Sequence, residues 1–165
     1  DNFKIYVDGK KIHMKDLVKF QNLIGYLPQQ NFLIDGTISE NVAFGENDID
    51  YQLVKNSLVK ADCYKFVNLL KNKLNHIVKE NGKNFSIGQL QRLGMARIIY
   101  FNNQILFLDE PTSALDKISE LKFIKLIKKL KKNKTMIIVS HQKNILKDCD
   151  KIFQLENKKL KKIDL

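Results

Sequence analysis

The sequence predicts an α/β protein in which a parallel sheet is joined to an inserted, mostly helical region. Residues 105–108 form a continuous apolar run, which is typical of a strand covered on both faces. Residues 118–130 have the periodicity of an amphipathic helix, and residues 135–140 predict a second buried strand. A strand, helix and strand in this succession predict a parallel crossover.

The first part of the chain predicts short elements. Residues 3–7 alternate as FKIYV and precede the turn-forming pair Asp8-Gly9, which indicates a strand, a turn and a second strand. Residues 15–22 predict a short helix, and residues 23–27 predict a strand that ends at Pro28.

Residues 37–101 are predicted to be a helical insertion between core strands. Thr37 and Glu40 have the spacing of a capping box, so a helix is expected to start there. Helical patterns follow over residues 51–60 and 62–70.

A second capping box is predicted at Ser86 and Gln89, with a helix from Ser86 towards Tyr100. Free amide groups at the start of this helix, with Gly88 permitting close approach, would suit a phosphate. Taken alone, the same pattern equally suits an ordinary capped helix.

Composition favours one domain in a reducing compartment. The 165 residues are 44% hydrophobic, enough for one core. Cys63 and Cys149 lie far apart without a C-x-x-C spacing, which argues against a zinc site or a disulfide framework. No apolar run reaches the roughly 20 residues that span a bilayer. Because the first residue is Asp1, we expect the chain to be a piece of a longer protein.

The net charge of +11 raises the question of nucleic-acid binding. The chain has only two arginines, Arg92 and Arg97, and is therefore poorly equipped for bidentate recognition of phosphate or guanine. The lysines of residues 125–134 alternate with apolar residues, as on the solvated face of an amphipathic helix. We therefore predict no nucleic-acid partner, and an anionic membrane surface is the second interpretation of these lysines.

The two predicted buried strands are followed by ionisable residues that could bind a metal ion or transfer a proton. Asp109 and Glu110 follow the first strand, and His141 follows the second. Ligands of parallel α/β sheets bind at this carboxyl edge. Two adjacent carboxylates there suit a division of roles, in which one binds a hard cation and the other handles a proton. In isolation the pair equally suits a solvated Asp-Glu-Pro turn.

Four motifs occur together in one order: FSIGQLQR, ILFLDEP, TSALD and IIVSH. In this combination the chain resembles an ATP-binding cassette (ABC) nucleotide-binding domain, with its signature motif, Walker B strand, D-loop and switch histidine. The segment FLIDGTISENVAFG resembles ABC exporters, and Gln29 matches the Q-loop glutamine. The segment HIVKENG resembles the exporter X-loop and keeps Val78, Glu80 and Gly82.

The resemblance implies an ATPase core, without its N-terminal part, over residues 1–36 and 102–165, and a helical subdomain over residues 37–101. It implies that Asp109 holds Mg²⁺ through a water and that Gln29 completes the metal and water shell. In the same way it assigns Glu110 as general base and His141 as a contact to the γ-phosphate of ATP.

The resemblance also implies partners. Ser86, Gly88 and Gln89 would bind the γ-phosphate held by a second nucleotide-binding domain in a head-to-tail dimer, and Asp116 would align that partner's site. Glu80 would contact the transmembrane domain of the same or a partner chain. The expected location is the cytoplasmic face of the inner membrane, where ATP hydrolysis would drive export.

Two departures from the family pattern matter. Ile87 replaces a glycine of the signature motif, so a left-handed backbone there would be strained. The sequence contains no G-x-x-x-x-G-K-[ST] loop, so we expect the isolated chain to hydrolyse no ATP, although the intact parent is expected to be an ATPase.

Two other classes remain as alternatives. One is a soluble DNA-repair or chromosome ATPase, which the short separation of Gln29 from Ser86 and the lack of heptads disfavour. The other is a non-catalytic interaction module.

Overall fold

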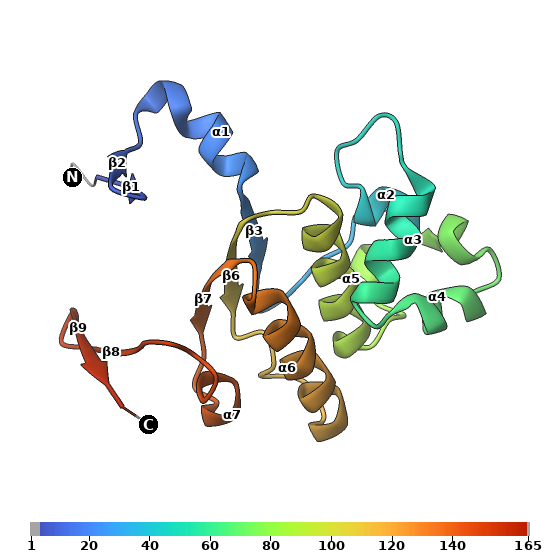
Figure 1. The fold of residues 1–165 in the computed structure, drawn as a ribbon. Helices are drawn as coiled ribbons and strands as arrows, with labels where there is room; N and C mark the ends of the chain where they lie inside the picture. Colours follow the sequence, from blue (N-terminus) through green and yellow to red (C-terminus); the bar gives the residue numbers. More distant parts are fainter. Residues whose placement is uncertain (1–3, 165) are drawn as a thin grey trace.

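A three-stranded parallel sheet forms the centre of the protein (Figure 1). In this computed structural model, which describes residues 4–164, the strands are β3 (Ile24–Leu27), β6 (Ile105–Asp109) and β7 (Thr135–Val139), with β6 in the middle. The register pairs Leu27 with Leu108 and Leu108 with Ile138. The parallel pairing predicted for residues 105–108 and 135–140 is therefore confirmed.

Helices and short antiparallel strand pairs make up the rest of the described chain. The remaining elements are β1 (Tyr6–Val7), β2 (Lys10–Lys11), the 3-10 helix η1 (Met14–Asp16), α1 (Leu17–Asn22), β4 (Gly36–Thr37), α2 (Ile38–Val42), α3 (Tyr51–Lys60), α4 (Tyr64–Leu69), η2 (Lys73–Asn75), β5 (Ile77–Val78), η3 (Glu80–Gly82), α5 (Ile87–Tyr100), α6 (Lys117–Lys131), α7 (Lys143–Leu146), β8 (Ile152–Glu156) and β9 (Lys159–Ile163).

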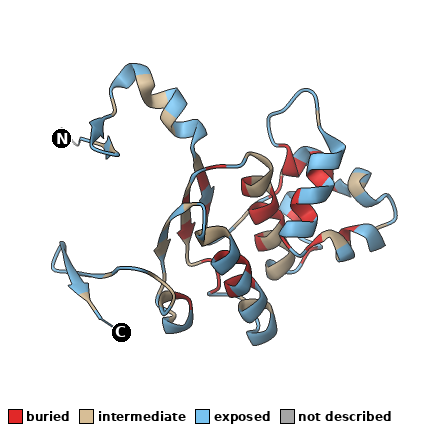
Figure 2. Ribbon diagram, in the orientation of Figure 1, coloured by how far each residue is buried: buried red, intermediate tan, exposed pale blue. Residues whose placement is uncertain are grey.

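One face of the sheet is covered by α5 and α6 (Figures 1 and 2). Leu106 and Leu108 of β6 are buried together with Met95 of α5 and Phe123 of α6 in one hydrophobic cluster. Fully burying a side chain of this size stabilises the fold by about 1.5–3 kcal/mol, so this layer provides the core.

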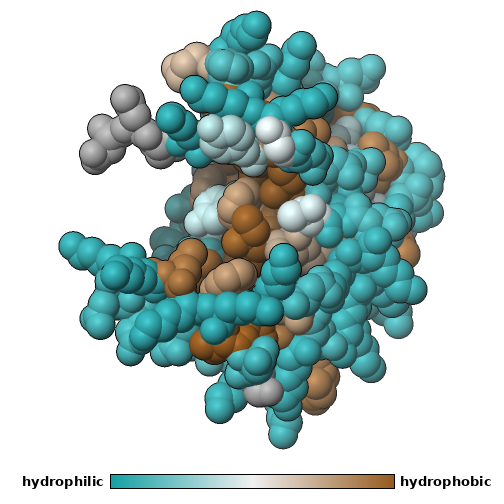
Figure 3. Space-filling view, turned by 60° about the vertical axis from the view of Figure 1, so that its left-hand side comes forward, coloured by the Kyte–Doolittle hydropathy of each residue, from teal (hydrophilic) through white to brown (hydrophobic). Residues whose placement is uncertain are grey.

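The opposite face of the sheet corrects one prediction. Residues 135–140 were expected to form a buried strand and residues 105–108 a strand covered on both faces. Tyr26, Ile137 and Val139 are instead exposed, and β7 contains no buried residue. The reason is that the described residues supply a covering layer for one face only, and apolar side chains gather in an open hollow on this part of the surface (Figure 3).

Helices α2, α3 and α4 pack on the side of α5 that faces away from the sheet (Figure 1). Helix α2 starts at the predicted capping box: Thr37 Oγ1 accepts from the Glu40 amide at 3.1 Å, and Glu40 accepts from the Thr37 amide at 2.6 Å. Val54 and Leu58 of α3 are fully buried and complete this smaller apolar layer.

The two ends of the described chain form antiparallel hairpins, β1–β2 and β8–β9, and the first of them confirms the strand, turn and strand predicted around Asp8-Gly9. Phe3, which was included in the first predicted strand, lies outside the described residues. No helix in the described part of the chain combines the length and the apolar character that crossing a bilayer requires.

Candidate functional site

Glu110 turns the chain sharply at the end of β6. Its φ is +44°, in the left-handed region that residues with a β-carbon rarely adopt. This backbone conformation costs roughly 1–3 kcal/mol of free energy, and two hydrogen bonds hold it in place. The Glu110 amide donates to the Val139 carbonyl at 2.9 Å, and the Glu110 carbonyl accepts from the Ser113 hydroxyl at 3.0 Å.

The turn places the Glu110 carboxylate over the end of β7. Oε1 accepts from the His141 amide at 3.0 Å, and Oε2 accepts from the Ser140 hydroxyl at 3.3 Å. The Nε2 atom of His141 lies 3.5 Å from Oε1. The Glu110 side chain is 12% exposed and that of His141 is 98% exposed, so a sheltered carboxylate lies beside an imidazole that faces solvent.

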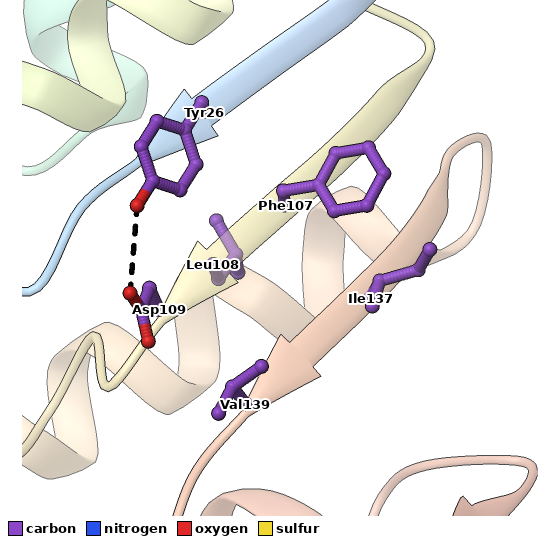
Figure 4. A pocket seen from close by; sticks show the side chains of 6 residues that line it. All are labelled: Tyr26, Phe107, Leu108, Asp109, Ile137 and Val139. Carbon is purple, nitrogen blue, oxygen red and sulfur yellow. Dashed lines mark hydrogen bonds between the residues drawn. The ribbon is translucent and has the colours of Figure 1, made fainter. Parts of the chain in front are cut away.

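Asp109 lies at the same edge, on the open face of the sheet. The Tyr26 hydroxyl donates to Asp109 Oδ2 at 3.4 Å, and both side chains line a hollow of about 160 Å³ with Phe107, Ile137 and Val139 (Figure 4). This leaves oxygen lone pairs of Asp109 available to another partner.

Gln29 follows β3 by two residues, as Glu110 follows Leu108 in the paired strand β6. Its side chain is exposed, and within residues 4–164 no hydrogen bond joins it to Asp109 or Glu110. The register therefore brings Gln29 to the carboxyl edge of the sheet, where Asp109 and Glu110 lie, but Gln29 forms no hydrogen bond with either carboxylate.

A hydrogen bond between Thr112 and Gln142 fixes the loop that follows Glu110. Thr112 is fully buried and its hydroxyl donates to Gln142 Oε1 at 2.6 Å. The Gln142 amide donates to the Ser140 hydroxyl at 3.1 Å, which links this pair to the Glu110 carboxylate.

Sequence reasoning missed Ser140, Gln142 and Tyr26. Ser140 and Gln142 flank His141, so their position was a usable signal. Tyr26 carried no such signal, because a tyrosine in a strand is most often a packing residue.

The Ser86 turn forms the N-terminus of α5. Ser86 Oγ accepts from the Gln89 amide at 3.2 Å, and Gln89 Oε1 accepts from the Ser86 amide at 2.9 Å, which confirms the predicted capping box. The Ser86 hydroxyl hydrogen and the Gln89 Nε2 group can still donate to a ligand. Ile87 is the first residue of α5, and its φ is not positive, so the left-handed strain considered for this position does not arise.

The start of α5 lies beside the start of α6. A Cβ atom added at Gly88 would meet Leu115 at 3.5 Å and Ser119 at 3.7 Å. Asp116 caps α6, with Oδ1 accepting from the Ile118 and Ser119 amides at 3.0 Å each. Hydrogen bonds from Ser119 hold the pKa of Asp116 below its usual value. The helix start and the carboxyl ends of the strands thus lie towards the same end of the molecule (Figure 1).

Glu80 lies on an unusual turn just before α5. Glu80, Asn81 and Gly82 all have positive φ values, of 51°, 57° and 73°. Glu80 forms a 3.0 Å ion pair with Lys83, and both side chains are more than two-thirds exposed. Such exposed pairs contribute about 0–1 kcal/mol, so Glu80 is free to exchange partners.

The described residues contain no cluster of three His, Cys, Asp or Glu side chains that would enclose a metal ion. The Asp109 carboxylate does suit Mg²⁺, because this ion is usually held by one or two carboxylates together with waters and substrate phosphates.

The fold and the site define a class of protein. A parallel sheet with a carboxylate pair at its carboxyl edge, beside a capped helix start, is the core of a P-loop NTPase. The sequence model described as "ABC transporter" matches residues 2–113, and the chain belongs to that family.

The chain is similar to parts of two named transport proteins. The chain is 35% identical over 162 residues to an ATP-dependent lipid A-core flippase of Wigglesworthia glossinidia brevipalpis, covering 97% of the chain and 28% of the flippase. It is 37% identical over 157 residues to the mitochondrial iron-sulfur clusters transporter ATM1 of Kluyveromyces lactis, covering 93% of the chain and 22% of the transporter.

The solved structure of a bacterial Atm1-family ABC exporter with ATP bound matches with a TM-score of 0.86 and 28% identity, over 96% of this chain and 28% of that chain. The chain therefore spans about a quarter of the length of these relatives.

Proposed function

We propose that this chain forms the ATP-hydrolysing edge of an ABC exporter, which couples ATP binding and hydrolysis to the movement of a substrate across a membrane. The observation that carries the proposal is the sheltered Glu110 carboxylate beside His141, in a chain of exporter family. The alternatives of a soluble DNA-repair ATPase and of a non-catalytic module gain no support from relatives named as flippase and transporter.

Glu110 acts as the general base. The His141 amide and the Ser140 hydroxyl each occupy one lone pair of a carboxylate oxygen, and each oxygen has another. A water bound to the free lone pair would transfer a proton to Glu110 as its oxygen attacks the γ-phosphorus, while the bond from the γ-phosphorus to the bridging oxygen breaks and ADP leaves. Because the carboxylate is held at both oxygens, it needs little reorganisation for this step.

His141 contacts the γ-phosphate. Its backbone amide is fixed by Glu110, whereas its ring is almost fully exposed and can rotate towards a ligand. An imidazole N–H placed there would donate to a phosphate oxygen and stabilise charge that develops during hydrolysis.

Asp109 and Gln29 are the residues that would hold Mg²⁺, through oxygen atoms and water. Asp109 is the last residue of β6, and Gln29 follows the neighbouring parallel strand β3 at the same edge of the sheet. When bound, Mg²⁺ would neutralise phosphate charge during the reaction. The Tyr26 hydroxyl donates to Asp109 Oδ2, so the other carboxylate oxygen remains available to an ion or a water.

The Ser86 turn binds the γ-phosphate of the ATP molecule that a second copy, or a second nucleotide-binding domain, holds. The first amide groups of α5, the Ser86 hydroxyl and the Gln89 side-chain amide form a set of donors suited to an anion. Within the described residues no hydrogen bond joins this turn to Glu110 or His141, which fits a pocket completed by a head-to-tail partner. Asp116, next to this turn through Ser119, would align the partner's site.

Glu80 contacts the transmembrane part of the transporter. Its exposure and its weak ion pair with Lys83 leave it available for a cationic or amide group of another domain. The domain would then act at the cytoplasmic face of the inner membrane.

The test is ATP hydrolysis by the full-length protein that carries this chain and a P-loop. Glu110→Gln keeps the size of the side chain and one acceptor oxygen for the His141 amide, and it removes the basicity, so kcat should fall at least about 100-fold. Glu46→Gln, at an exposed glutamate in the loop after α2, is the matched control and should leave the rate unchanged. Equal rates for Glu110→Gln and the wild type would refute the proposal.

A further inference from the structure

Two side-chain hydrogen bonds fasten the Gln29 loop to α5. Gln91 Nε2 donates to the Gln29 carbonyl at 2.9 Å and lies 3.5 Å from the Pro28 carbonyl. Asn31 Nδ2 donates to the Leu90 carbonyl at 2.6 Å. One bond runs from the helix to the loop and the other from the loop to the helix, so the loop is held from both sides.

The packing at this contact leaves no spare room. Gln91 is only 3% exposed. A Cβ atom built at Gly94 would lie 2.5 Å from Asn31 Nδ2 and 2.7 Å from Leu27 Cδ1. The absence of a side chain at Gly94 is therefore what allows Asn31 to reach the Leu90 carbonyl.

Gln91 also retains an unused polar atom. Its Oε1 is buried and has no hydrogen-bond partner among the described residues. An unsatisfied buried acceptor costs about 1–3 kcal/mol, so it is not explained by fold stability.

We infer that Gln91 and Asn31, with Gly94 packed against Asn31, form a latch that sets the position of the Gln29 side chain relative to α5. The two latch residues touch neither nucleotide nor metal, so they are positioning residues. The latch makes Gln29 follow any movement of α5. That this movement matters for ATP hydrolysis rests on the proposed function.

The latch also connects the two halves of the proposed chemistry. Ser86 and Gln89 begin α5, and Gln91 lies within its first two turns. A phosphate bound by the Ser86 turn would therefore restrict α5, and the latch would transmit this restriction to Gln29. Contact with one copy's nucleotide would in this way adjust the metal and water shell of the other site.

The first experiment needs no catalysis. Gln91→Glu is nearly isosteric and replaces the donor that faces the Gln29 carbonyl with an acceptor, so it should break this bond. Hydrogen exchange of the backbone amides of residues 29–32 in this chain should speed up about tenfold. Gln52→Glu, at an exposed glutamine of α3, is the matched control and should change nothing there. Unchanged exchange in Gln91→Glu would overturn the latch.

The second experiment measures steady-state ATP hydrolysis by the full-length protein. Gln91→Glu should lower kcat about tenfold and change KM for ATP less than twofold, because Gln91 does not contact the nucleotide. In a Gln29→Ala background the same substitution should cost less than twofold, since its effect passes through Gln29. Full additivity of the two losses would overturn the inference.

A second variant protects the test against misfolding. Asn31→Ala removes the other latch bond from a half-buried position and should give the same non-additivity with Gln29→Ala. If the wild-type protein hydrolyses no ATP, the proposed function fails, while the exchange experiment still decides whether the latch exists.

Discussion

The substitution Gly94→Ala tests the packing of α5 against the Gln29 loop. The added methyl group would lie 2.5 Å from Asn31 Nδ2 and 2.7 Å from Leu27 Cδ1, both far inside normal contact. Displacing Asn31 removes a hydrogen bond worth about 1 kcal/mol. Overpacking against Leu27 costs about 1–3 kcal/mol, and the better helix propensity of alanine returns about 1 kcal/mol. The free energy of unfolding should therefore fall by roughly 1–3 kcal/mol.

The same substitution at Gly88 should change the free energy of unfolding in the opposite direction. A Cβ atom at Gly88 would meet its nearest neighbour, Leu115, at an ordinary 3.5 Å. Gly88→Ala should therefore raise the free energy of unfolding by about 0.4–1 kcal/mol through the unfolded state. Urea unfolding of the chain, followed by circular dichroism, should move the midpoint down by about 0.5–1.5 M for Gly94→Ala, with an m-value of about 2 kcal/mol/M, and slightly up for Gly88→Ala. A Gly94→Ala protein as stable as Gly88→Ala would refute the packing argument.

Three further predictions follow from caps and burial. Thr37→Ala removes the cap of α2 and should lower the free energy of unfolding by about 1 kcal/mol, measured in urea; an unchanged midpoint would contradict the role of the capping box. Because the pKa of Asp116 is lowered in the folded state, the ionised carboxylate stabilises the fold above the unfolded pKa of 3.8, and this stabilisation is lost as pH falls through the folded pKa. Asp116→Asn should therefore make the melting temperature depend less steeply on pH in the acid range. An unchanged pH dependence would contradict this prediction. Burial raises the pKa of the Cys63 thiol to about 12, so alkylation of Cys63 by iodoacetamide at pH 8 should occur only at the rate of unfolding, and fast labelling of the folded chain would contradict this burial.

Much of the fold could be predicted from sequence because its signals are local. The predicted helix over residues 51–60 matches α3, and the start at Ser86 matches α5, since periodicity and caps act within a few residues. The exposure of β7 could not be predicted in this way. Apolar residues at Ile137 and Val139 predict a covered strand, but coverage depends on elements that are distant in the sequence.

The candidate site shows the same division. The sequence order and the parallel register were enough to bring Glu110 and His141 to one edge. The positive φ of Glu110 could not be predicted, because glutamate has no preference for that conformation and it is imposed by the bonds to Val139 and Ser113. The link between Gln91 and the Gln29 loop joins residues far apart in the sequence, and neither side chain carries a local signal for it.

In the function proposed here, each nucleotide pocket combines Glu110 of one copy with Ser86 of another. Two forms of the full-length protein with different affinity tags can be co-expressed and purified as mixed dimers, using Glu110→Gln and Ser86→Arg. When each copy carries one of the two substitutions, both damaged groups fall in one pocket and the other pocket is intact. When a single copy carries both and its partner is wild type, each pocket has one damaged group.

The decisive measurement is the ATP hydrolysis rate of these two mixed dimers. A shared pocket predicts clear activity when the substitutions are on different copies and almost none when both are on one copy. The reverse order of rates would contradict the account, because it would mean that Glu110 and Ser86 act on the same nucleotide within one copy.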